Sequence, residues 1–156
     1  MGDFKEGEQA LTQANIYDPL NGEVWGYLAL LALNDGQRMV QAHQCLREML
    51  KCELKNHDLL EELADKLSNI NKFELAETLY KKLLDIWQNL PHTLASMNPG
   101  SIYCKLAKIY HADERLLEAK IYYTEALKFL EGESEKERVE IILNDIKNAL
   151  ESIQGN

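Results

Sequence analysis

Two similar stretches, "ELAETLYKKLLDIW" (residues 74–87) and "LEAKIYYTEALKFL" (117–130), decide the fold of this chain. Each contains an alanine followed four positions later by a tyrosine: Ala76 and Tyr80 in one, Ala119 and Tyr123 in the other. Residues four apart lie on one face of a helix, so each stretch presents a small and then a large residue to the same neighbour. Two copies of one helical pattern indicate a repeated structural unit.

A second shared pattern precedes each of these stretches. "LLEELADKL" (59–67) and "IYCKLAKIY" (102–110) both place a large residue, then a large–small pair, then another large residue at helical spacing. Each copy of the unit is therefore predicted to be a pair of helices. Small residues are expected where the two helices cross, with larger ones filling the space beside them.

Helical periodicity extends along almost the whole chain. Apolar residues recur at spacings of three and four, and no stretch shows the alternation typical of a strand. The fold is therefore predicted to be all-α, with antiparallel helix hairpins joined by short turns. Helices are expected near residues 5–17, 22–35, 38–54, 57–70, 73–88, 101–112, 116–131 and 135–153.

This arrangement resembles the tetratricopeptide repeat (TPR), a helix–turn–helix unit of about 34 residues with the pattern W-x2-L-G-x2-Y…A-x3-F…P. The resemblance covers a half motif, one looser motif and two full motifs: 5–19, 22–56, 57–90 and 100–133. It implies a right-handed superhelical array of antiparallel hairpins, a TPR-like α-solenoid.

The chain also departs from a regular array. Residues 91–99 form an insertion between two motifs, and the helix at 134–153 lacks the repeat pattern. We expect that last helix to be the capping helix that such arrays need at an open end. The sequence begins inside a repeat, so 1–156 is predicted to be a single TPR-like domain of a longer protein.

A narrower resemblance involves "EVWGYLALLAL" (23–33) and "LKCELKNHDLLEEL" (50–63). These segments look like the C-terminal repeats of axonemal cilia- and flagella-associated TPR proteins linked to outer dynein arms. The resemblance implies a location at the axoneme of a cilium or flagellum. Most of the matching residues belong to the repeat scaffold, so no functional residue is transferred.

Composition limits the classes of partner. A net charge of −9 disfavours nucleic acid, because phosphate binding needs concentrated Lys and Arg. No apolar run is long enough to span a membrane, and the first residues, "MGDFKEGEQ", lack the basic patch and apolar core expected of a signal peptide. The three cysteines are predicted to be reduced thiols, which favours a cytoplasmic protein. The oligomeric state stays open.

No motif for catalysis or metal binding is present in the sequence. It lacks a phosphate-binding glycine loop, an H-E-x-x-H motif and a Cys-x2-Cys pair. Cys45 and Cys52 lie near His43 and His57, but a zinc site would need closer pairs from two elements. We interpret these cysteines as small apolar fillers, and we expect no enzymatic activity, cofactor or metal.

Binding to another protein is the function that the resemblance implies. The first helices of such repeats line a groove, and the residues predicted to bind a partner there are Glu23, Tyr27, Leu30, Leu33, Asp58, Glu61, Asp65 and Lys108. The expected partner is a protein or peptide with apolar and basic residues. The alternative is that the three acids, which share one helix face, form a solvated surface that binds nothing.

Other functions are weighed against this scaffold role. Chaperone-tail binders of the TPR class hold a carboxylate with Lys and Asn, yet Gly26 and Leu30 occupy those positions here, and Asp65 occupies the next. Co-chaperone activity is therefore disfavoured. An architectural element with an unused groove, packed inside a larger complex, and a regulatory appendage to an enzyme both remain alternatives.

Overall fold

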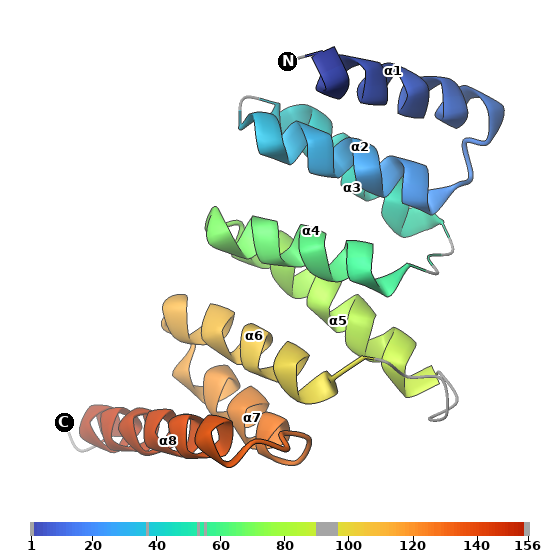
Figure 1. Ribbon diagram of the computed structural model, residues 1–156. Coiled ribbons are helices and arrows are strands. Elements are labelled where there is room, and N and C mark those ends of the chain that lie inside the picture. Colours follow the sequence, from blue (N-terminus) through green and yellow to red (C-terminus); the bar gives the residue numbers. More distant parts are fainter. Residues whose placement is uncertain (1, 37, 53, 55, 90–96, 155–156) are drawn as a thin grey trace. The chain divides into compact units, whose positions relative to one another are not determined.

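The computed structural model describes residues 2–36, 38–52, 54, 56–89 and 97–154. Within these ranges the chain forms eight helices and no strand, which confirms the predicted all-α fold (Figure 1). The helices are α1 (Gly2–Tyr17), α2 (Gly22–Asp35), α3 (Met39–Lys51), α4 (His57–Asn69), α5 (Phe73–Asn89), α6 (Pro99–Ala112), α7 (Leu116–Leu127) and α8 (Glu133–Gln154).

The starts of α2, α4 and α6 share one local device. An asparagine precedes each of these helices, and its side-chain oxygen accepts a hydrogen bond from a main-chain N–H in the first turn: Asn21, Asn56 and Asn98. Such a cap satisfies one of the donors that a helix leaves without an internal partner, and it is typically worth about 1 kcal/mol. The first helix of each predicted motif is therefore started by the same residue type.

The turns that follow these helices also share a conformation. Each contains one residue with positive φ: Gly36 at 67°, Asn71 at 58° and Glu114 at 58°. In two of the turns the next residue donates its main-chain N–H back to the preceding helix over 2.8 Å, from Lys72 to Leu67 and from Arg115 to Tyr110. This left-handed residue reverses the chain within a few positions and allows a tight hairpin.

The chain divides into two compact units, Met1–Leu79 and Tyr80–Asn156. In the first unit, α2 packs against α3, and α1 packs against α2. The α2–α3 interface is made of small and long apolar side chains that are almost fully buried: Ala29, Ala32, Ala42, Leu46 and Met49. Ala76, in the part of α5 that belongs to this unit, is also 0% exposed, as the repeat pattern predicts.

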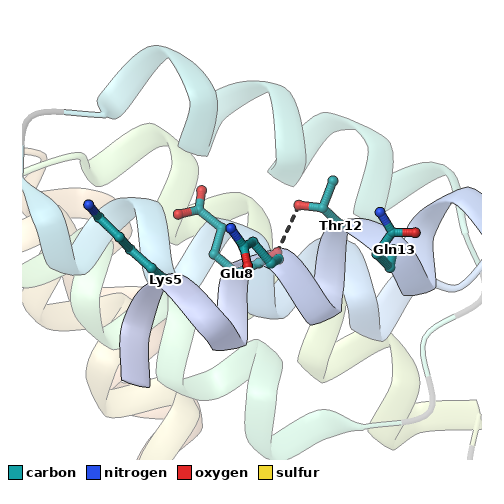
Figure 2. A pocket seen from close by; sticks show the side chains of 5 residues that line it. Lys5, Glu8, Thr12 and Gln13 are labelled. Atoms are coloured by element: carbon teal, nitrogen blue, oxygen red, sulfur yellow. Dashed lines mark hydrogen bonds between the residues drawn. The ribbon is translucent and has the colours of Figure 1, made fainter. Parts of the chain in front are cut away.

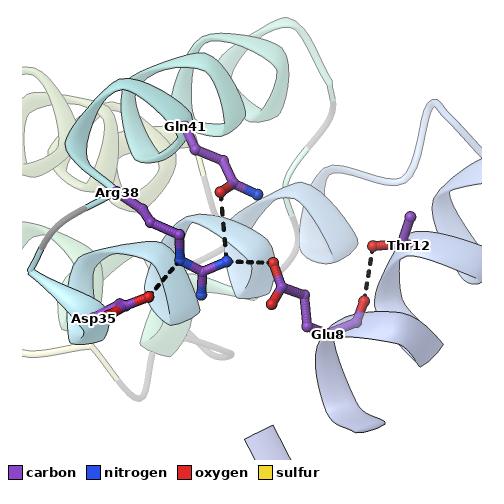
Figure 3. Close-up of polar contacts among 5 residues, drawn as sticks. All are labelled: Glu8, Thr12, Asp35, Arg38 and Gln41. Carbon is purple, nitrogen blue, oxygen red and sulfur yellow. Dashed lines mark hydrogen bonds and ion pairs between the residues drawn. The ribbon is translucent and has the colours of Figure 1, made fainter. Parts of the chain in front are cut away.

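Arg38, next to the α2–α3 turn, attaches α1 to the rest of the first unit (Figure 3). Its guanidinium lies 2.5 Å from Glu8 of α1 and 2.7 Å from Asp35 of α2. The hydrogen bond to Glu8, followed by the charges of both acids, raises the pKa of Arg38. Beside this contact, α1 carries a shallow polar depression lined by Lys5, Glu8, Gln9, Thr12 and Gln13 (Figure 2).

In the second unit, α6 and α7 form a hairpin against which α8 packs through α7. Ala119 is 0% exposed, which confirms that the small residue of this copy of the repeat is buried. Stacked rings link α6 to α7 and to the segment that follows it: Tyr110 stacks on Tyr122 of α7 at 5.0 Å between centroids, and Tyr103 stacks on Phe129, after the end of α7, at 5.6 Å.

The helix α8 is amphipathic, as expected for a cap. Val139 and Ile146 are buried, whereas Ile141 and Ile153 are exposed. The burial of one apolar face against α7 agrees with a capping role. The predicted motif boundaries and the single-domain organisation stay predictions.

Several helix ends differ from the sequence prediction. The helix α3 ends at Lys51 rather than 54 because Cys52 adopts an extended conformation, and Leu54 turns inward to pack near Gly22. The helix α7 ends at Leu127 rather than 131. Pro99, placed in the predicted insertion, instead lies at the start of α6, where its fixed φ suits a helix. Residues 91–96 of the predicted insertion lie outside the described residues.

Candidate functional site

The predicted binding residues of the first unit lie on α2 and α4, two helices in contact with each other. Gly26 makes this contact possible. A Cβ atom at this position would lie 2.7 Å from Cδ2 of Leu59 on α4 and 3.1 Å from the sulfur of Met49 on α3. Because glycine has no side chain, α4 can approach α2 closely and bring the predicted residues of both helices onto neighbouring faces.

The apolar part of this surface comes from α2. Tyr27 is 40% exposed, and its hydroxyl oxygen accepts a long hydrogen bond of 3.5 Å from the amide of Asn56, the cap of α4. Leu30 is half-buried next to it on the helix, and Glu23 is half-buried one turn earlier. Tyr27 therefore offers a large, partly ordered ring to solvent.

Leu33 does not share this exposure. Only 8% of its surface is accessible, because it lies on the side of α2 that faces the core together with Ala29 and Ala32. Leu33 is therefore part of the core, and the prediction that it contacts a partner is wrong. Sequence periodicity could not separate the edge of the buried face from the surface beside it.

The acidic part of the surface comes from α4. Asp58 is exposed, and Glu61 and Asp65 are half-buried. Both half-buried acids take part in polar or electrostatic interactions within the structure, so they are held rather than freely solvated. We call the set Glu23, Tyr27, Leu30, Asp58, Glu61 and Asp65 the α2–α4 surface.

Lys108, the last predicted residue, belongs to the second unit. It lies beside a recess of about 490 Å³ whose walls come from α6 and α8, which we call the α6–α8 recess. Cys104 and Tyr123 also line it. Burial, and then the nearby Cys104, raises the pKa of Tyr123 to about 12. Burial raises the pKa of the Cys104 thiol too, and Lys108 opposes that shift.

Burial disfavours the reactive thiolate form of Cys45 and Cys104. Burial raises the pKa of the Cys45 thiol as well, and a protonated thiol is a poor nucleophile. Among the residues that the structure describes, no group of three or more His, Cys, Asp or Glu side chains could hold a metal ion. Within the same residues, no helix is long and apolar enough to cross a membrane.

Sequence reasoning missed the α8 side of the recess. Arg138 and Val139 line it together with Lys108. The sequence of α8 predicted a capping helix but gave no signal of which α6 residues would lie beside it. The recurring Asn caps and left-handed turn residues were also missed, although Asn71 and Glu114 stand in the same place relative to Ala76 and Ala119.

Comparison with known protein families shows to which family the chain belongs. Residues 1–142 match the model of the cilia and flagella-associated protein 70 C-terminal domain, a TPR-type domain. The chain belongs to this family. Its fold and family point to a non-catalytic repeat protein. The predicted resemblance to the TPR family and to cilia- and flagella-associated proteins is thereby confirmed.

Individual relatives match over a shorter stretch. Cilia- and flagella-associated protein 70 of Macaca fascicularis and of Homo sapiens are each 43% identical to the chain over 61 residues, or 39% of its length. The matched stretch covers 6% and 5% of those proteins, respectively. The chain therefore corresponds to a small part of these relatives.

Solved structures support the fold. The BtubC (BKLC) structure from P. vanneervenii has a TM-score of 0.65 at 22% identity, covering 98% of this chain and 68% of that one. PilF of Pseudomonas aeruginosa has a TM-score of 0.61 at 16% identity, covering 97% and 63%. MamA has a TM-score of 0.58 at 15% identity, covering 99% and 93%. These likenesses show an all-α helical-repeat fold of the TPR type.

Proposed function

We propose that this domain is a protein-interaction scaffold of a ciliary or flagellar assembly protein, and that its α2–α4 surface binds a protein segment with apolar and basic residues. The TPR-type fold and the names of the relatives support the general role. The observation that carries the proposal is the position of Tyr27 and Leu30 next to Asp58, Glu61 and Asp65 on two helices in contact.

The physical basis is a preformed surface. The helices are capped and packed before any partner arrives, so little ordering entropy opposes binding. A partly exposed tyrosine supplies a large contact area with few rotamers to fix, as in the energetic centres of many interfaces. The carboxylates attract Lys or Arg, and this attraction contributes to the association rate and the orientation of the partner.

Peptide titrations test the proposal. Synthetic peptides with leucines and lysines should bind the wild-type chain more tightly than peptides that carry the same leucines and have glutamines in place of the lysines. Neutralising Asp58, Glu61 and Asp65 to the matching amides should weaken binding several-fold and flatten its salt dependence, because charge attraction is screened by salt. The control variant neutralises three other acids, Glu6, Asp18 and Glu74, which are exposed and lie outside α2 and α4.

A second pair of variants tests the apolar contact. Tyr27→Ala should lower the affinity for the basic peptide by about tenfold, since aromatic residues carry much of the energy of an interface. Tyr17→Ala removes an 86% exposed tyrosine on α1 and should leave the affinity unchanged. Equal affinities for all of these variants would place the interaction elsewhere.

The architectural role remains a second candidate because of exposed apolar side chains on α3 and α7. Val40 is 84% exposed, and Leu117 and Ile121, one turn apart on α7, are 61% and 60% exposed. An element that packs inside a larger complex would use such residues. Changing Leu117 and Ile121 to Ser should then abolish incorporation into the complex and leave peptide binding intact.

A further inference from the structure

We propose that the α6–α8 recess is a second peptide-binding site, opposite in charge to the α2–α4 surface, and that it takes an acidic segment bearing a large apolar side chain. This inference rests on the proposed scaffold function for its class of ligand. It does not depend on the α2–α4 surface, since all of its residues lie in the second unit.

The shape of the recess suits a side chain rather than a flat contact. Its volume of about 490 Å³ falls within the range of about 300–1,000 Å³ typical of ligand sites. Three buried side chains form apolar lining: Tyr123 of α7, Leu130 after it and Val139 of α8. An apolar side chain placed there would leave water and gain the contacts that these residues offer.

The charge of the recess determines which residues of a bound peptide are favoured next to its apolar side chain. Lysines and an arginine outnumber acids among the lining residues, which include Lys105, Lys108, Arg138 and Glu135. This excess of positive charge occurs in a chain whose net charge is −9. Lys108 and Arg138 are exposed, and neither forms an ion pair with another residue in the described part of the chain. Both cations are therefore available to carboxylates of a partner.

A peptide fits these features better than a nucleic acid does. Nucleic-acid binding requires a basic stripe that follows many phosphates. Here two available cations stand beside a confined apolar lining, in an otherwise acidic chain. Asp and Glu next to Leu, Ile or Phe match that combination, because carboxylates pair with Lys108 and Arg138 while the apolar side chain enters the recess.

Fluorescence anisotropy with two short labelled peptides tests the site on the whole chain. One peptide combines leucines with glutamates, and the other has lysines in place of the glutamates. The variant Lys108→Glu/Arg138→Glu should lower the affinity for the acidic peptide by about tenfold or more at low salt, because the attraction becomes repulsion. The matched control, Lys120→Glu/Lys147→Glu, makes the same charge change at exposed positions of α7 and α8 outside the recess.

Cys104 provides an independent readout of position. It lines the recess and is half-buried, whereas Cys52, also half-buried, lies in the first unit. Saturating acidic peptide should slow the alkylation of Cys104 by iodoacetamide several-fold and leave Cys52 unchanged, as measured by mass spectrometry of the digested protein.

Each outcome decides the proposal. Selective weakening by the Lys108/Arg138 variant, with protection of Cys104, supports it. Failure of the acidic peptide to bind the wild-type chain, equal affinities for both charge variants, or unprotected Cys104 overturns it. The scaffold function itself is tested separately, because the basic peptide and the acid-to-amide variants of α4 report on the α2–α4 surface alone.

Discussion

Ala119→Leu is the substitution that most sharply tests the repeat register on which the fold assignment depends. The methyl group of Ala119 is 0% exposed, whereas Lys120 and Ile121 beside it on α7 are exposed. Leucine adds three carbon atoms at a point where α6 and α7 pack together. The stacked pair Tyr110–Tyr122, at 5.0 Å, joins the same two helices and opposes their separation. Overpacking of this kind costs about 1–3 kcal/mol.

That cost should be visible in thermal unfolding followed by circular dichroism. For a chain of this size, about 1 kcal/mol lowers the melting temperature by about 2–4 °C, so we expect a decrease of about 2–12 °C. The control is Ala10→Leu, the same change at an exposed position of α1. It should melt with the wild-type chain. If Ala119→Leu also melted with the wild-type chain, the small residue would not lie at a close crossing and the assigned register would be refuted.

Three further predictions concern the second unit. Gly100→Ala should destabilise the chain by about 1–3 kcal/mol in urea unfolding, because its Cβ would lie 3.1 Å from main-chain atoms of Phe129 and Leu130; Gly132→Ala, with nothing nearer than 3.9 Å, is the control. Deleting residues 133–156 should expose the α7 face that α8 covers and cause aggregation in light scattering; a monomeric product with an unchanged melting temperature would contradict the capping role. Burial raises the pKa of Tyr123 to about 12 in the folded chain, whereas an unfolded tyrosine ionises near pH 10. The contribution of Tyr123 to the free energy of unfolding is therefore fully present below pH 10 and should be lost between about pH 10 and 12, with a slope of up to about 1.4 kcal/mol per pH unit. Tyr123→Phe should remove this pH dependence.

Helix positions could be predicted from the sequence because they depend on local pattern. Ala76 and Ala119 stand out as small residues at fixed places in an apolar stripe, and both are fully buried. Pro19 and the polar residues of the turns are local signals that end a helix. The starts and ends of most helices follow from these local signals.

Helix ends that depend on tertiary packing could not be predicted in this way. The main chain at Phe129 and Leu130 comes within reach of Gly100, so the chain after α7 is shaped by a contact far away in sequence. Leu54 similarly leaves the expected helix and is buried close to Gly22. Apolar periodicity extends through both positions and does not signal the earlier end of the helix.

The candidate surfaces were predictable only in part. Spacing along α4 correctly indicated that Asp58, Glu61 and Asp65 could share a face, because that relation is set within one helix. The α6–α8 recess forms only when α6 and α8 lie beside each other in the folded chain, and the apolar spacing within one helix does not predict which helix lies next to it. Arg138 therefore reads as one more charge on a solvated face until α8 is placed beside α6.

Mapping of a bound peptide by amide chemical shifts in nuclear magnetic resonance tests the central claim most directly. With an isotope-labelled chain and the basic, leucine-containing peptide, the account predicts that the largest shifts cluster on α2 and α4, around Tyr27 and Asp58, and that the Tyr27→Ala variant needs about tenfold more peptide to reach half of the full shift. Shifts that instead centred on Val40 of α3 or on Leu117 and Ile121 of α7 would contradict the account and identify α3 or α7 as the binding surface.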